Sequence, residues 1–124
     1  MGYRTPLSKV EGLGSAHSGV EHFWKQRVTA TALVPLSIWF CVAMLGLVGA
    51  DRDAIVEFLH APLHAVLMIL FVLSVLMHMA LGMEVVIEDY LPKTGQRIAA
   101  RMLMRGFTWL VGAACLFALF KIAV

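Results

Sequence analysis

The chain contains 124 residues, of which 60% are hydrophobic and only 15% charged, and its formal net charge is +2 at pH 7. A mean hydropathy of +0.84 excludes a soluble globular domain of this size, because such a domain needs a largely polar surface. No basic cluster alternates with aromatic residues, so we expect no binding of nucleic acid. The class that remains is an integral membrane protein.

Residues 1–18 are rich in Gly and Ser and predict a flexible tail, followed by one membrane domain over residues 19–124. We expect neither a cleaved secretion signal nor an organelle transit peptide, because the tail lacks an apolar segment and an Arg/Ser-rich amphipathic pattern. The simplest location is therefore a bacterial inner membrane, where the domain contacts lipid.

Three long stretches contain no Asp, Glu, Lys or Arg: 28–50, 58–83 and 106–120. A helix needs about 20 apolar residues to cross a hydrocarbon core of roughly 30 Å. We therefore predict an all-α fold with three membrane-spanning helices, at about residues 24–50, 54–90 and 97–122. Pro35 is expected either to kink the first of them or to be tolerated through neighbouring contacts. Cys41 and Cys115 lie within spans, where we expect no disulfide.

The basic residues indicate how the chain crosses the membrane. Eight of them lie in the N-terminal segment or in and beside the connection between the second and third spans: Arg4, Lys9, Lys25, Arg27, Lys93, Arg97, Arg101 and Arg105. The connection 51–57 has only Arg52 against three acidic residues. Because short loops rich in Lys and Arg stay in the cytoplasm, we predict a cytoplasmic N-terminus and an outside C-terminus.

His78 is the main candidate for chemistry, since it interrupts the apolar run of the second predicted helix. It precedes Glu84, the first charge after that run, by six residues, which places it about 9 Å deeper. Ionisable residues at such depth usually face protein, a cofactor or a cavity. Three interpretations stay open from position alone: an interhelical hydrogen bond, a ligand of a b-type haem iron, or a proton relay.

The remaining histidines of this helix, His60 and His64, form an i, i+4 pair near its other end. Such a pair suits a metal ion or two interfacial side chains at the outer membrane surface. The first and third predicted spans contain no histidine. The chain alone therefore cannot supply both axial ligands of a bis-histidine haem beside His78, and a second ligand must come from another subunit.

Polar residues at the cytoplasmic ends of the helices offer further candidates. Asp89 lies 11 residues after His78, on nearly the same helix face and about 16 Å along the axis, and Tyr90 adjoins it. A tyrosine hydroxyl can donate a hydrogen bond to a carbonyl oxygen, although both residues also suit a solvated membrane edge. Arg27 is either a cytoplasmic anchor or a partner for an anionic cofactor group. Glu84 and Glu88 are interpreted as a solvated face.

These residues together form two motifs that are similar to those of a known family. The second helix reads H-x-x-x-G-M-x-x-V-x-x-D-Y from His78 to Tyr90, and the entry to the first reads G-V-x-x-F-x-x-x-R-x-T-A from Gly19 to Ala30. The chain resembles the small hydrophobic membrane anchor subunit of bacterial succinate dehydrogenase, respiratory complex II, from Gly19 onward. The motif of the second helix is fairly specific, and the rest of the resemblance is generic hydrophobicity.

The resemblance implies a role for each matching residue. His78 corresponds to an axial ligand of haem b, with the other ligand supplied by the larger cytochrome b anchor subunit. Tyr90 corresponds to the tyrosine that hydrogen-bonds ubiquinone, Asp89 to the acid that supports this quinone site, and Arg27 to a possible partner of the haem propionates. His60 and His64 correspond to no family role.

The resemblance also implies the function, a membrane anchor that is not catalytic alone. It would hold the iron–sulfur and flavoprotein subunits of succinate:ubiquinone oxidoreductase at the membrane and help to form the ubiquinone reduction site. Two alternatives stay open: an anchor of fumarate reductase working with menaquinone, and a structural membrane protein without a cofactor.

Overall fold

The computed structural model describes residues 5–7 and 18–124, so the predicted tail, residues 1–18, lies almost wholly outside the described residues. Helices account for nearly all of the rest: α2 (Ser18–Gly46), α3 (Arg52–His60), α4 (Pro62–Tyr90) and α5 (Thr94–Ala123). Three of them, α2, α4 and α5, are long and apolar enough to cross a membrane. The predicted all-α fold with three membrane spans is confirmed.

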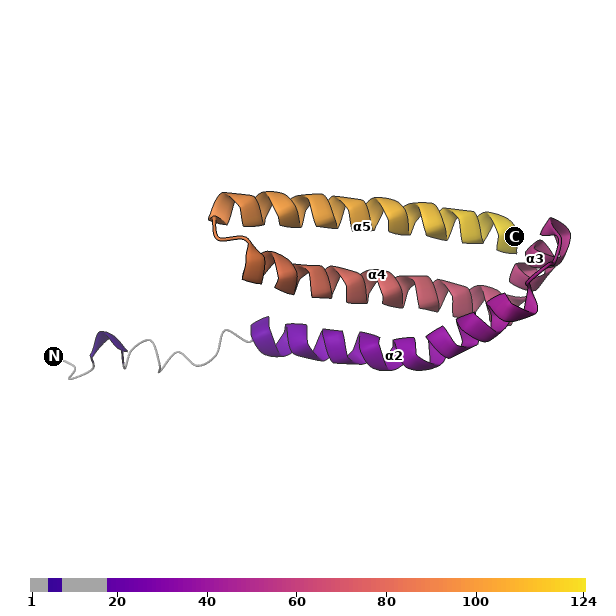
Figure 1. Ribbon diagram of the computed structural model, residues 1–124, viewed down its shortest axis with the longest axis horizontal. Coiled ribbons are helices and arrows are strands. Elements are labelled where there is room, and N and C mark those ends of the chain that lie inside the picture. The colour runs from indigo at the N-terminus through magenta and orange to yellow at the C-terminus, as the bar shows by residue number, and fades with distance from the viewer. Residues whose placement is uncertain (1–4, 8–17) are drawn as a thin grey trace.

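Helix α4 lies in the middle of the structure and packs against both α2 and α5 (Figure 1). Among the described helices, α2 and α5 do not contact each other, and the short α3 packs on α4 and α5 at the end where the chain finishes. Few side chains are buried in this arrangement; the apolar ones are Ala65, Met68, Ile87 and Met104. The long helices therefore form a row with two open faces, and not a closed bundle.

The second predicted helix, residues 54–90, is wrong as a single element, because the chain breaks between α3 and α4. Ala61 adopts an extended conformation, with φ −64° and ψ 124°, and Pro62 begins α4. The ring of a proline disfavours helical backbone at the preceding residue, but proline fits the first turn of a new helix, where its missing N–H would have no partner. Asp51 caps the start of α3, since its carboxylate accepts a hydrogen bond from the backbone N–H of Ala54 at 2.9 Å.

Helix α2 begins and ends earlier than the predicted 24–50. It continues to Gly46, after which a turn leads to Gly49, whose φ of 81° is readily adopted only by glycine. Figure 1 shows that α2 bends in its second half, downstream of Pro35, as expected for a proline inside a helix. Cys41 and Cys115 are both free thiols, as predicted.

The contact between α4 and α5 is close at Gly112. A Cβ atom added to this buried glycine would lie 3.3 Å from Cδ1 of Leu76, so the missing side chain lets the two helices approach. The turn between these helices follows Leu91, whose carbonyl oxygen accepts a hydrogen bond from Nε of Arg97. These contacts help to hold α4 and α5 antiparallel and side by side.

Candidate functional site

His78 lies on α4 at the contact with α2, and its ring is half-buried. Its Nδ1 lies 3.1 Å from the hydroxyl oxygen of Thr29 on α2. Thr29 is only 7% exposed, and no other polar side chain in the described part of the chain is classed as buried. The predicted intramembrane histidine is therefore held by a specific polar contact between two helices, with its other ring nitrogen, Nε2, left for a further partner.

A shallow hollow of about 340 Å³ opens beside this histidine. It is lined by Phe23, Gln26, Arg27, Ala30 and His78. The guanidinium carbon of Arg27 lies 5.1 Å from the centre of the Phe23 ring, a cation–π arrangement that directs the cation along this surface. Two residues that the sequence singled out separately, His78 and Arg27, thus line the same hollow.

The chemistry of this donor set fits a b-type haem. A neutral imidazole nitrogen is a usual axial ligand of haem iron, and a guanidinium is the preferred partner of a carboxylate such as a propionate. Gly82, one turn beyond His78, has nothing within 4 Å of the position that a Cβ would take, so a flat group has room against this part of α4. Among the described residues that line this hollow, His78 is the only histidine.

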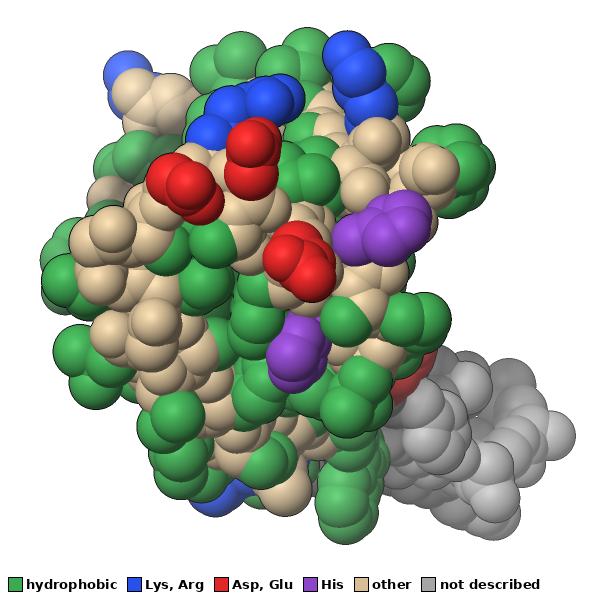
Figure 2. All heavy atoms as spheres, turned by 90° about the vertical axis from the view of Figure 1, so that its right-hand side faces the viewer, with side chains coloured by type: hydrophobic (Ala, Val, Ile, Leu, Met, Phe, Trp, Pro, Cys, Tyr) green, Lys and Arg blue, Asp and Glu red, His purple; other side chains and the backbone are tan. Residues whose placement is uncertain are grey.

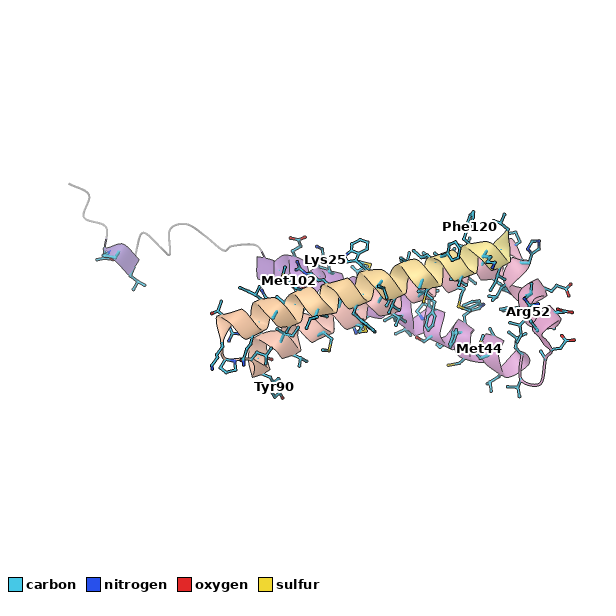
Figure 3. All side chains as sticks on the ribbon, turned by 90° about the horizontal axis from the view of Figure 1, so that it is seen from above. Lys25, Met44, Arg52, Tyr90, Met102 and Phe120 are labelled. Atoms are coloured by element: carbon cyan, nitrogen blue, oxygen red, sulfur yellow. The ribbon has the colours of Figure 1, made fainter. Side chains whose placement is uncertain are left out.

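Asp89 and Tyr90 lie at the C-terminal end of α4 and not at the hollow. Both are exposed, Tyr90 by 79%, and Figure 3 shows its side chain directed away from the other helices. No hydrogen bond or ion pair joins either side chain to another described residue. The structure thus leaves their polar groups free for a partner from outside the chain.

The interpretation of Glu84 and Glu88 as a solvated face is wrong for Glu84, whose partly buried carboxylate reaches two other helices, whereas Glu88 is exposed as predicted. Glu84 lies 3.5 Å from Nε2 of His22 on α2 and 3.1 Å from the guanidinium of Arg105 on α5. Glu88 forms an ion pair with Arg101. These contacts surround a second hollow, of about 590 Å³, on the side of α4 between α2 and α5.

Sequence reasoning missed Thr29 and His22, since their partners lie far along the chain. The signal for Thr29 was its hydroxyl within an apolar helix, two residues after Arg27 in the motif from Gly19 to Ala30. For His22, the signal was its place at the end of a membrane span, at the same depth as the acidic residue Glu84 on another helix. Neither signal identifies the partner without a structure.

The two histidines near α3 do not form the predicted i, i+4 pair on one helix, because the break at Ala61 separates them. The ring of His64 stacks on Phe58 at 3.9 Å between centroids and lies 6.3 Å from Trp39, while its Nδ1 donates to the carbonyl oxygen of Phe58 at 3.1 Å. His60 is exposed, with Nδ1 3.4 Å from the carbonyl oxygen of Ile122.

Figure 2 looks onto this end of the molecule and shows acidic and histidine side chains on its surface. Within the described ranges, no three His, Cys, Asp or Glu side chains come together as a metal site. The contacts of His64 therefore assign it a structural task, which is to join α3 to α4.

Fold and site together define a small all-α membrane protein with three spans and a buried polar contact at an intramembrane histidine. Residues 1–120 match the family model described as the succinate dehydrogenase/fumarate reductase transmembrane subunit. Since the match covers almost the whole chain, the chain belongs to this family. The resemblance noted from the two motifs is confirmed.

Individual relatives agree with the family. The chain is 34% identical over 124 residues to the succinate dehydrogenase hydrophobic membrane anchor subunit of Paracoccus denitrificans, covering 100% of this chain and 95% of the relative. It is 37% identical over 89 residues to the subunit of that name in Rickettsia bellii, covering 72% and 71%. The succinate dehydrogenase membrane anchor subunit of Reclinomonas americana is 32% identical, covering 71% and 76%. With its three apolar helices, the chain is a multi-pass bacterial membrane protein.

Proposed function

We propose that the chain is the small membrane anchor of a succinate:ubiquinone oxidoreductase, which shares a haem b with a larger anchor subunit and contributes to the ubiquinone site. The observation that carries the proposal is His78, held at Nδ1 by Thr29 beside a hollow that Arg27 also lines. The flavoprotein and iron–sulfur subunits would dock at the end where α2 begins and α4 meets α5, which we assign to the cytoplasm because its basic residues outnumber those of the other end.

His78 and Arg27 would hold the haem from this chain. Haem b, when bound, accepts and donates one electron at a time. His78 presents Nε2 to the iron, while Thr29 keeps the ring between α2 and α4. Arg27 neutralises a propionate from the membrane edge. A second ligand of the iron would come from the larger anchor subunit, because His78 is the only histidine that lines the hollow among the described residues.

Tyr90 and Asp89 would serve the quinone from the exposed end of α4. The Tyr90 hydroxyl donates a hydrogen bond to a carbonyl oxygen of ubiquinone, which favours the negative charge that develops there during reduction. Asp89 holds a basic group of a neighbouring subunit and so shapes the site beside Tyr90. Their free polar groups at the membrane edge support this assignment.

The proposal is tested with the affinity-purified chain and its co-purifying partners. The reduced-minus-oxidised visible spectrum is expected to show the α-band of a b-type haem in the wild type and in the control His60→Ala, whose histidine is exposed. The band should vanish in His78→Ala. A colourless wild-type complex without succinate–quinone reductase activity would instead favour the structural protein without a cofactor.

The family description also covers fumarate reductase subunits, so the direction of the reaction needs its own measurement. The relatives named above are succinate dehydrogenase subunits, which favours oxidation of succinate as the direction of the reaction. The quinone extracted with the complex decides between the two. Menaquinone as the bound species would move the assignment to the fumarate reductase alternative.

A further inference from the structure

The hydroxyl group of Thr29 lies within hydrogen-bond distance of two backbone carbonyl oxygens of α2 and of the His78 ring. The hydroxyl oxygen of Thr29 lies 2.9 Å from the carbonyl oxygen of Lys25 and 3.0 Å from that of Gln26, both one turn back on α2. It lies 3.1 Å from Nδ1 of His78. A hydroxyl has one proton to donate, whereas a carbonyl oxygen only accepts. When the proton points to a carbonyl of α2, the lone pairs of the oxygen face the imidazole.

This arrangement selects one form of the histidine. A hydroxyl oxygen that faces Nδ1 with a lone pair requires a proton on Nδ1, and a neutral imidazole protonated there has its own lone pair on Nε2. Only a nitrogen with a free lone pair can bind a metal. The acceptor is buried, at 7% exposure, so water does not readily replace it.

We propose that Thr29 is a positioning residue for haem, which fixes the Nδ1–H tautomer and the ring orientation of His78 and thereby makes Nε2 the ligating atom. This inference rests on the proposed function. A hydrogen-bond acceptor behind a ligating imidazole also raises the basicity of the ligand, which favours the ferric state and lowers the midpoint potential. Because Thr29 and Arg27 lie two residues apart on α2, this one helix would both orient His78 and neutralise a haem propionate.

Three substitutions separate this role from general packing. Thr29→Val keeps the shape but removes the acceptor, and Thr29→Ser restores the acceptor without the methyl group. Thr31→Val is a matched control two residues further along α2, since the hydroxyl of Thr31 donates to the carbonyl oxygen of Arg27 at 2.8 Å and is exposed. All three are made in the full complex and compared with the wild type.

In Thr29→Val we expect haem affinity to fall about 10- to 100-fold and the midpoint potential of the remaining haem to rise. Thr29→Ser should recover both values, and Thr31→Val should leave both unchanged. Wild-type affinity and potential in Thr29→Val would overturn the inference, as would equal changes in both valine variants. A wild type without haem would overturn the proposed function itself, so the two failures are distinguishable.

A measurement on unmodified Thr29 keeps the test open should the valine variant not assemble. The complex is prepared from haem-deficient cells with ¹⁵N-histidine, and the His78 signals in solid-state NMR are identified by their absence from His78→Gln. We expect a protonated Nδ1 and an unprotonated Nε2. A proton on Nε2 in the haem-free complex would contradict the selection of this tautomer by Thr29.

Discussion

Replacing His64 tests whether its side chain holds α3 against α4 across the break at Ala61. His64→Ala removes two contacts with Phe58: the stacked rings at 3.9 Å between centroids, and the hydrogen bond from Nδ1 to the carbonyl oxygen at 3.1 Å. Both contacts join α4 to the last turns of α3, a helix of nine residues without a buried residue of its own. We therefore expect α3 to open more often in the variant, while α4 stays folded.

The size of the effect follows from these two contacts. An aromatic pair contributes about 1 kcal/mol beyond its buried area, and an intramolecular hydrogen bond about 1 kcal/mol net. The sum of about 2 kcal/mol corresponds to a roughly 30-fold change in an opening equilibrium. His64→Phe keeps the ring contact and loses the hydrogen bond, so about fivefold is expected for it.

Amide hydrogen exchange of the peptide that covers α3 measures this opening directly in the full complex. His60→Ala is the matched control, since His60 is exposed and makes one long contact of 3.4 Å to a carbonyl oxygen. It should accelerate exchange by no more than about twofold. Equal exchange rates in His64→Ala and His60→Ala would contradict the assignment of His64 as the residue that joins the two helices.

Three further outcomes are expected. Glu84→Gln should lower the free energy of unfolding by about 1 kcal/mol. Because the pair with Arg105 is partly exposed, a double-mutant cycle with Arg105→Gln should give a coupling energy of about 0.5 kcal/mol. A coupling energy of zero would show that this ion pair does not stabilise the protein. Gly112→Ile should destabilise the α4–α5 contact by about 2 kcal/mol in detergent unfolding, whereas Gly106→Ala, with open space around it, should cost little. Tyr90→Phe should lower kcat/KM for ubiquinone about tenfold and leave the haem spectrum unchanged; an unaltered kcat/KM would remove Tyr90 from the quinone site.

The membrane spans could be predicted from the sequence because a bilayer demands long apolar runs, and composition alone reports them. The break at Ala61 was missed for a related reason: the apolar run continues through it, so hydropathy does not change where the backbone does. Pro62 was the available signal, since it restricts the residue before it. Local backbone chemistry, and not hydrophobicity, determines the end of α3.

For the candidate site, the sequence identified some of the functional residues but not the partners that they contact. His78 could be singled out because an imidazole in an apolar run is costly without a partner, but its partner Thr29 is 49 residues away in the sequence. Glu84 was misassigned because charge alone does not reveal the ion pairs that its carboxylate makes with other helices. Asp89 and Tyr90 stay predictions, since their proposed partners belong to other molecules.

The row formed by α2, α4 and α5 has a consequence for how the cell handles this chain. Since α2 and α5 are not packed against each other among the described residues, α4 has an uncovered flank on each side, and the half-buried polar side chains of His78 and Glu84 lie at those flanks. A newly inserted copy therefore exposes intramembrane polar groups until a neighbouring subunit covers them. Polar groups without partners are costly within a bilayer, and cells remove incompletely folded chains by proteolysis. We expect orphan copies to be short-lived, so that the amount of this chain follows the supply of its partner subunits and not its own rate of synthesis.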